Sequence, residues 1–288
     1  MTTTPSERFG VLPKIELPAC LEFLKLKNFP LKTYPSVYQP PRLTKDTLYI
    51  FGPGWRNTWG SFDAECLQFQ IYLKFAGLEF DVINSNEPDA SPSGKLPFLA
   101  TVPGAIYHDQ QIHKWIDDMG KSQVLAGEHS EDAKAFISLA NTKLNAALIF
   151  SMWLEPLNYS KATSEAYFGH VPAPVDYILA YKKQNKVVQQ LLADRDILVR
   201  EEIYSDAVHA LEALSVKLGE ATYFFGSSGP TWIDAVIFSY IHIILGAPQF
   251  TDSSVSDEEK RQASTLRNLV LKHDNLVRFA KNIREKYL

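Results

Sequence analysis

The spacing of apolar residues changes along the chain, from strand-like alternation in the first part to a helical period in the second. A β-branched and aromatic run over Thr47–Phe51, stopped by glycine and proline, predicts a strand. Apolar residues then recur at helical spacing up to Gly77, which predicts a helix buried on two sides. Leu78–Val82 alternates between apolar and polar residues and predicts a second strand.

A hairpin and a helix complete this first part. Phe98–Val102 and Ala105–His108 predict two strands joined by a proline-glycine turn, and Asp109–Asp118 predicts a helix packed on them. The order strand, helix, strand, strand, strand, helix is typical of a thioredoxin-type domain in which one connecting element is lost or irregular. We assign this domain to residues 46–119.

Residues 130–288 show only the helical period and predict an all-helical domain. A long helical segment is expected from about Asn185 to Leu218. Trp232–Leu245 is apolar almost all round, which is typical of a buried central helix. Two amphipathic helices are expected over 256–271 and 274–287. The predicted fold is therefore α/β followed by all-α.

The first 45 residues contain seven prolines, which excludes a long helix or a central strand over most of this segment. The segment is nevertheless rich in aromatic and aliphatic residues, unlike a free linker. We interpret residues 1–45 as an arm that packs on a partner. Buried aromatic and aliphatic side chains dominate interface energetics. The predicted partner-binding residues are Phe29, Leu31, Tyr34 and Tyr38.

Charge and composition narrow the function. The net charge is −4, with 29 basic and 33 acidic residues, so no basic field favours nucleic acid. Cys20 and Cys66 are the two cysteines, and they form neither a CxxC motif nor a Cys/His cluster. The seven histidines are scattered, and His242, in the most apolar segment, is the one expected to have a pKa shifted by burial. We expect no metal site and no cofactor.

The apolar segments also bear on membrane insertion. The longest, Ile233–Leu245, is shorter than the roughly 20 residues that a bilayer-spanning helix needs. Met1–Gly10 has one arginine and no apolar run, unlike a secretory signal or an amphipathic presequence. We expect no membrane span in this chain and a cytosolic address.

Two motifs at a characteristic separation resemble the glutathione-transferase superfamily: Gly94–Phe98 before the hairpin, and Ser228–Ala235 at the start of the central helix. The resemblance implies a cis bond before Pro97 and a backbone at Leu96 that faces a peptide-like ligand. In the second motif, Thr231 and Asp234 have the spacing of a capping box and are expected to stabilise the fold.

Within this superfamily, three segments resemble the metaxins: Glu65–Gly77, Ser91–Leu99 and the end of the chain from Asn275 to Leu288. Phe29–Pro35 resembles the corresponding start of the fungal peripheral receptor subunit of the mitochondrial sorting and assembly machinery. The resemblance covers about residues 29–288. The joint order and spacing of these segments carry it, since no single one is decisive.

This resemblance implies a non-catalytic subunit that helps to receive and insert β-barrel precursor proteins. It implies a peripheral position on the cytosolic face of the mitochondrial outer membrane. The implied partners are an outer-membrane β-barrel insertase subunit, a second metaxin-like subunit and the β-barrel precursors. Some metaxin-like proteins carry a C-terminal membrane tail, whereas this sequence ends at Leu288, which favours the peripheral receptor.

An active transferase needs a side chain that stabilises a thiolate just after the first strand. Thr58 and Ser61 lie there, but turn and cap roles explain them better, and Cys66 falls on an apolar helix face. Gln110 stands where the superfamily has a Ser or Thr that holds the γ-glutamyl group of glutathione. We therefore expect no catalytic residue. The alternatives are a divergent glutathione-dependent transferase and a docking domain of a translation or tRNA-synthetase complex.

Overall fold

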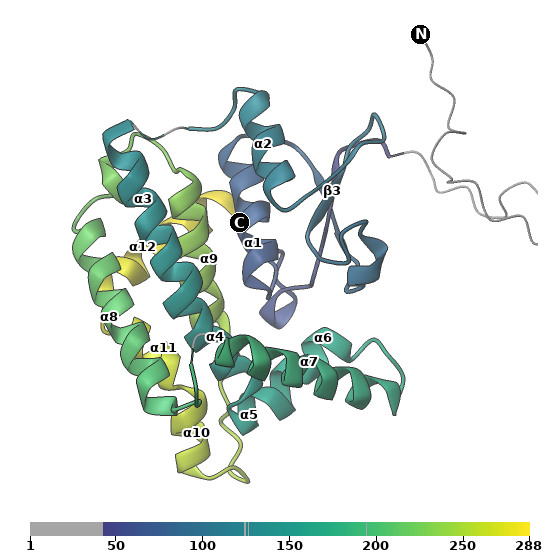
Figure 1. The fold of residues 1–288 in the computed structure, drawn as a ribbon, viewed down its shortest axis with the longest axis vertical. Coiled ribbons are helices and arrows are strands. Elements are labelled where there is room, and N and C mark those ends of the chain that lie inside the picture. Colours follow the sequence, from purple (N-terminus) through teal and green to yellow (C-terminus); the bar gives the residue numbers. More distant parts are fainter. Residues whose placement is uncertain (1–42, 124, 126, 194) are drawn as a thin grey trace, which may run out of the picture. The chain divides into compact units, whose positions relative to one another are not determined.

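The computed structural model describes residues 43–123, 125, 127–193 and 195–288 (Figure 1). All of these belong to one compact unit, Arg42–Leu288. The predicted arm anchors lie outside the described residues, so their partner-binding role stays a prediction. They are Phe29, Leu31, Tyr34 and Tyr38.

The N-terminal half is built on a four-stranded sheet in the order β2-β1-β3-β4. The strands are β1 (Thr47–Ile50), β2 (Asp81–Asn84), β3 (Phe98–Ala100) and β4 (Ile106–His108). β1 pairs in parallel with β2 and antiparallel with β3, and β3 pairs antiparallel with β4. This is the strand arrangement expected for a thioredoxin-type domain. A single 3₁₀ turn, η4 (Pro88–Ala90), stands between β2 and β3, where the sequence predicts a lost or irregular element.

Helix α1 (Ala64–Phe75) packs between the sheet and the helical half, and both of its sides are buried, as its two apolar faces predict. Its last turn explains one error of the sequence analysis. The Leu78 N–H donates to the Leu73 carbonyl, so Leu78 still closes the helix. The second strand therefore begins at Asp81 and not at Leu78. Helix α2 (Gln110–Asp118) follows the hairpin.

The second half is helical throughout. Its helices are α3 (Gly127–Leu139), a π-helical turn η5 (Ala140–Leu144), α4 (Asn145–Trp153), α5 (Pro156–Asn158), a second π-helical turn η6 (Tyr159–Thr163), α6 (Ser164–Phe168), α7 (Val175–Leu192), α8 (Arg200–Leu218), α9 (Trp232–Gly246), α10 (Asp257–Ala263), α11 (Thr265–Val270) and α12 (Asp274–Tyr287). As predicted, α9 is the buried central helix, in contact with α1, α3, α11 and α12 (Figure 1).

Two helix predictions were wrong in their boundaries. The long segment expected from about Asn185 consists of two helices, because the chain leaves the helical conformation after Leu192 and is extended at Val199. The predicted start, near Asn185, was too late, because α7 begins at Val175 and has apolar residues on its outer face as well. The helix expected over 256–271 is interrupted at Ser264, whose ψ of 0° ends α10 before α11 begins.

By length and composition alone, the helical stretch His129–Trp153 could cross a bilayer, whereas α9 is too short. A core helix has the same composition, and 44% of the most apolar window is buried inside the protein. The stretch packs against α8 and α9, so its apolar residues serve the core.

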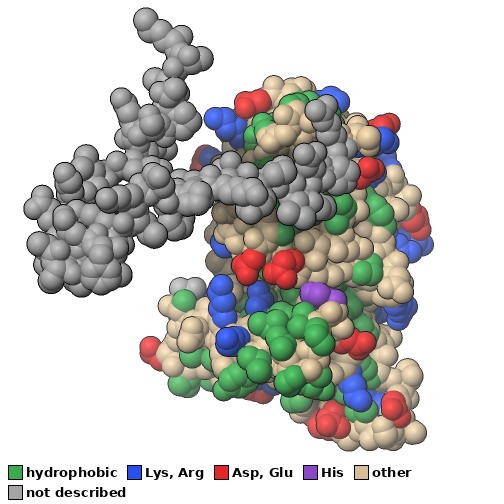
Figure 2. Space-filling model, turned by 90° about the vertical axis from the view of Figure 1, so that its right-hand side faces the viewer, with side chains coloured by type: hydrophobic (Ala, Val, Ile, Leu, Met, Phe, Trp, Pro, Cys, Tyr) green, Lys and Arg blue, Asp and Glu red, His purple; other side chains and the backbone are tan. Residues whose placement is uncertain are grey.

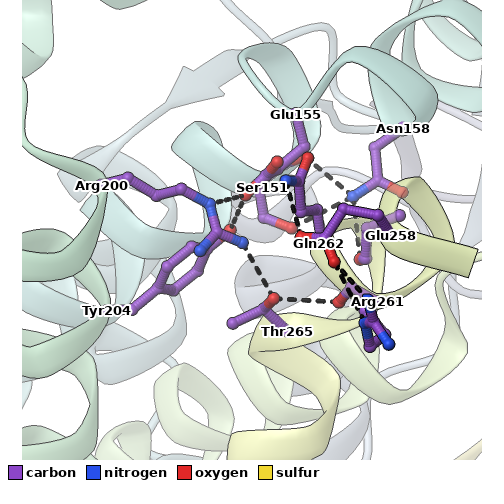
Figure 3. A network of polar contacts seen from close by, with 10 residues as sticks. Ser151, Glu155, Asn158, Arg200, Tyr204, Glu258, Arg261, Gln262 and Thr265 are labelled. Carbon is purple, nitrogen blue, oxygen red and sulfur yellow. Dashed lines mark hydrogen bonds and ion pairs between the residues drawn. The ribbon is translucent and has the colours of Figure 1, made fainter.

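A polar network inside the helical half joins the start of α5 to α8 and α11 (Figure 3). The Glu155 side chain is only 5% exposed, and its Oε1 accepts from Arg200 Nε and from the Tyr204 hydroxyl, each at 2.8 Å. Arg200 also donates to Thr265 Oγ1 at 2.9 Å. A buried carboxylate is tolerated when it is paired and hydrogen-bonded, so this network fixes how the three helices meet.

Candidate functional site

A cavity of about 400 Å³ lies between the sheet-containing half and the helical half. The N-terminal turn of α1 and the start of α2 form one wall, and α3, α4, α6, α7 and α9 form the others. Its walls combine aromatic side chains with carboxylates. The residues that matter below are Phe62, Asp63, Glu65, Asp109, Gln110, Trp153, Tyr167, Lys183, Trp232 and Tyr240.

Asp63 anchors the floor of this cavity to both halves. Its Oδ1 accepts from the Cys66 N–H at 3.1 Å, which caps α1, and its Oδ2 accepts from the Tyr167 hydroxyl at 2.9 Å. Tyr167 is buried against Phe62 and Trp153. Cys66 is fully buried, as its place on an apolar helix face predicts, and burial raises the pKa of its thiol well above the usual value. This thiol is therefore protonated at neutral pH.

The cavity carries more negative than positive charge. Asp63, Glu65 and Asp109 line it, against the single cation Lys183. Desolvation, followed by the charges of Asp63 and Asp109, raises the pKa of Glu65 to about 7, even though the residue keeps solvent-exposed surface in the cleft. Such a cleft disfavours a ligand with two carboxylates such as glutathione, because like charges repel in a partly desolvated space.

The turn into α2 has no side-chain cap. Asp109 occupies the N-cap position, where an aspartate commonly caps a helix, but its side chain makes no capping hydrogen bond. Its φ of 46° and ψ of −128° are not the extended conformation that a capping residue adopts. Its Oδ2 lies 3.5 Å from His108 Nδ1, and its Oδ1 is enclosed without a partner among the described residues. Gln110 lines the cavity with an amide, as the sequence indicates.

The two hydroxyls considered as thiol activators do not line this cavity. Ser61 is buried, and its Oγ donates to the Phe51 carbonyl at 2.5 Å and accepts from the Asp63 N–H at 3.0 Å. Thr58 lies on an exposed loop, where its backbone forms a bridge with Gly54. Both residues therefore serve the loop after β1 and not the cleft.

The two fold motifs take up different places. The Leu96–Pro97 peptide bond is cis, and Leu96 is buried, but neither residue lines the cavity. Thr231 and Asp234 form a capping box at the start of α9. The Asp234 carboxylate accepts from the backbone N–H groups of Phe224 and Thr231 at 2.8 Å each and from the Thr231 hydroxyl at 2.9 Å.

Histidines and metal ligands add no chemistry to this site. Among the described residues, no group of three or more His, Cys, Asp or Glu side chains could hold a metal ion. Burial, followed by the charge of Arg284, lowers the pKa of His242 to about 4, so this histidine is neutral at pH 7. His242 was the histidine that the sequence singled out for a shifted pKa.

Sequence reasoning missed several cavity residues. Glu65 was named only as part of a family motif. It lies in the first turn of α1, two positions after the N-cap residue Asp63, and this turn lines the cleft. Tyr167 stands in an aromatic stretch before several prolines, a pattern that fits either internal packing or a partner contact. Its ring is buried, so the residue packs inside the protein. Trp153 and Lys183 gave no local signal, because only tertiary folding brings them to Asp63.

Comparisons with known proteins agree with this architecture. A family described as outer mitochondrial membrane transport complex protein matches residues 66–184, and the glutathione S-transferase C-terminal domain matches residues 207–283. The glutathione transferase GSTFuA3 from Phanerochaete chrysosporium superposes with a TM-score of 0.55 at 15% identity, over 84% of this chain and 97% of that chain. It shows the fold alone.

The chain is similar to several metaxins. Metaxin-3 from Xenopus laevis is 31% identical over 198 residues, which cover 65% of this chain and 64% of that protein. Metaxin-1 from Macaca fascicularis is 30% identical, over 67% of this chain and 64% of that protein. Human metaxin-2 is 28% identical, over 78% and 82%. The chain thus spans 64% of the length of the first two metaxins. The fold prediction and the predicted resemblance are confirmed: this chain is similar to the metaxins and to the outer mitochondrial membrane transport complex family, on a glutathione-transferase-like fold.

Proposed function

We propose that this protein is a non-catalytic subunit of the mitochondrial outer-membrane sorting and assembly complex. In this role it lies peripherally on the cytosolic face and helps to receive and insert β-barrel precursor proteins. The family matches support a place in an outer-membrane transport complex. The observation that carries the non-catalytic part is that neither Thr58 nor Ser61 lines the cleft and that the Ser61 hydroxyl donates to the Phe51 carbonyl.

The partners in this proposal are a β-barrel insertase subunit, a second metaxin-like subunit and the precursors themselves. We assign the insertase contact to the arm, residues 1–45, with Phe29, Leu31, Tyr34 and Tyr38 as its anchors. Large apolar side chains in a segment poor in regular structure are suited to filling grooves on a partner. The thioredoxin-like domain, 46–119, and the helical domain, 130–288, then form the scaffold that presents this arm.

A divergent glutathione-dependent transferase is the second candidate. A cavity of about 400 Å³ favours it, because it provides a space for a peptide-like ligand. The buried bond of Ser61 to Phe51, the amide at Gln110 and the negative cleft weigh against it. A cavity that has no donor to stabilise a thiolate can bind a thiol ligand without activating it.

The test is affinity purification from detergent-solubilised mitochondria with the tagged full-length chain and a version lacking residues 1–45. Co-purifying proteins are identified by mass spectrometry, and circular dichroism establishes that the truncated version is folded. A point variant of the full-length chain replaces the two arm tyrosines, Tyr34→Ala and Tyr38→Ala, and so tests the anchors without removing the arm.

We expect an outer-membrane barrel to co-purify with the full-length chain, less of it with the tyrosine variant, and none with the truncation. Absence of a barrel from every purification would contradict the scaffold role. A glutathione-conjugation assay on the same samples separates the second candidate, since turnover above the uncatalysed rate would establish an enzyme.

A further inference from the structure

Helix α7 presents two apolar faces, only one of which is covered. Ala180, Val187 and Leu191 are buried and hold the helix to the protein. The opposite face is exposed over its first two turns. The exposed fractions are 46% for Val175, 69% for Tyr177, 51% for Ile178 and 62% for Tyr181. We call these four residues the α7 patch. Contiguous exposed apolar surface of this kind usually marks a binding surface.

Positive charge borders the α7 patch. Figure 2 shows a hydrophobic area on the lower part of the molecule with Lys and Arg side chains on its left, while Asp, Glu and His side chains lie above it and to its right. Lys182 and Lys186 are exposed on the same side of α7. All of α7 lies in the described part of the chain, and its one carboxylate, Asp176, is half-buried with Oδ1 enclosed. The outer face of the helix is therefore apolar and cationic, although the whole chain is acidic.

The two tyrosines indicate what kind of environment the α7 patch fits. No hydrogen bond from the Tyr177 or Tyr181 hydroxyl is present among the described residues, so each can keep a water or a lipid headgroup as its partner. Tyrosine prefers the boundary between apolar and aqueous phases, because its ring is apolar and its hydroxyl is polar. Lysines at the rim of such a face extend their ammonium groups towards negative headgroups.

We infer that the α7 patch docks on the surface of an anionic phospholipid bilayer, with Val175, Ile178 and the tyrosine rings at the headgroup boundary and Lys182 and Lys186 facing acidic headgroups. Charge complementarity favours a bilayer over a protein groove, because α7 has two exposed lysines beside the patch and its one carboxylate, Asp176, is half-buried. This inference deepens the proposed function and rests on its peripheral position, since it names the surface that lies on the membrane.

The experiment measures co-sedimentation of the full-length chain with vesicles. One set of vesicles is phosphatidylcholine alone, and the other contains phosphatidylserine as well. The first variant carries Ile178→Ser and Tyr181→Ser, and the second carries Lys182→Glu and Lys186→Glu. A matched control carries Val216→Ser and Ile197→Ser, which remove two exposed apolar side chains elsewhere, at 83% and 68% exposure.

We expect the unmodified chain to bind the vesicles that contain phosphatidylserine and to bind pure phosphatidylcholine weakly. Replacing Ile178 and Tyr181 lowers the vesicle partition coefficient about tenfold, because apolar burial at the interface is lost. The variant with both lysines reversed lowers the vesicle partition coefficient by at least about fivefold for each lysine. The Val216 and Ile197 control stays unchanged. Equal losses in this control, or no loss in the Ile178 and Tyr181 variant, would overturn the inference.

A photo-crosslinking residue at position 177, in the intact membrane-bound complex, distinguishes a bilayer from a protein partner. Crosslinks to lipid support the inference, and crosslinks to protein alone overturn it. The affinity purification described above is independent of this outcome. A chain that recovers the barrel but fails to bind vesicles would therefore refute the docking surface and leave the proposed function standing.

Discussion

Helices α9 and α2 each have an aspartate at their start, and the two side chains have opposite surroundings. Asp234 in α9 has no exposed surface and accepts three hydrogen bonds, two from backbone N–H groups and one from a hydroxyl. Asp109 before α2 has one oxygen enclosed without a partner among the described residues, and its backbone is held at a positive φ.

Asp234 stabilises the fold, whereas Asp109 lines the cleft. Burial raises the pKa of Asp234 to about 6, and the three donors oppose that rise, so the carboxylate is ionised at neutral pH and organises the start of α9. Asp109 faces the cavity, has few donors and adds negative charge beside Glu65. An acidic residue at a helix start is structural when the surrounding backbone donates to it.

The largest effect in this comparison is expected from Asp234→Ala. The substitution leaves the buried N–H groups of Phe224 and Thr231 without acceptors, so we expect a loss of about 3 kcal/mol in the free energy of unfolding. The matched control is Ser256→Ala in the exposed capping box of α10, which should cost at most about 1 kcal/mol. Urea unfolding followed by circular dichroism measures both. Equal costs would show that burial does not distinguish the two caps.

A second test uses the buried ion pair between Glu155, the N-cap residue of α5, and Arg200, the first residue of α8. Arg200→Met leaves Glu155 with the Tyr204 hydroxyl as its remaining donor, and we expect a loss of about 2 kcal/mol, because an enclosed charge loses its partner. Arg261→Ala breaks an exposed ion pair with Glu258 and should cost less than about 1 kcal/mol. The same unfolding measurement compares the two variants. A small effect of Arg200→Met would mean that water reaches Glu155.

The third prediction concerns pH and the far end of α9. The pKa of His242 is lowered in the folded state to about 4 from 6.5, so the unfolded chain takes up a proton at a higher pH than the folded one. Stability is therefore lost as the pH falls from about 6.5 towards 4. Arg56, Arg267, Arg284 and Glu285 line the same cavity as His242, and the arginines oppose its protonation.

Compared with the unmodified chain, His242→Gln should lose less stability over this range, by about 2 to 3 kcal/mol at pH 4.5, and the two chains should have the same pH dependence above pH 7. Unfolding midpoints across the pH range measure this difference. Parallel pH profiles for the two chains would contradict the lowered pKa, and a histidine NMR titration would then locate the actual value.

The comparison of α9 and α2 also shows what the sequence could and could not predict. The α9 cap was predictable because Thr231 and Asp234 interact across three positions of one helix. The order of strands and helices was predictable for the same reason, since apolar periodicity is local. The failed cap at Asp109 depends on a backbone angle that no side-chain pattern encodes.

The cavity itself depends on long-range contacts. The Tyr167 hydroxyl reaches Asp63 across 104 positions of sequence, so neither residue alone predicts the site. The negative charge of the cleft also needs the fold, because it joins Glu65 of α1 to Asp109 after the hairpin. The outer face of α7 was missed for a different reason. A helix with apolar residues on two faces has no clear amphipathic pattern, so its start was placed near Asn185 instead of Val175.

The smallest expected effect belongs to Asp109, and it has the opposite sign to that of Asp234. A φ of 46° with a ψ of −128° is strained for a residue with a side chain and open to glycine, so Asp109→Gly should stabilise the fold by about 1 kcal/mol. Asp109→Asn, which keeps the strain and removes the charge, is the control and should change stability by less. Urea unfolding measures both. If Asp109→Gly destabilises the protein as Asp234→Ala does, then the start of α2 depends on its aspartate and the two helix starts are alike.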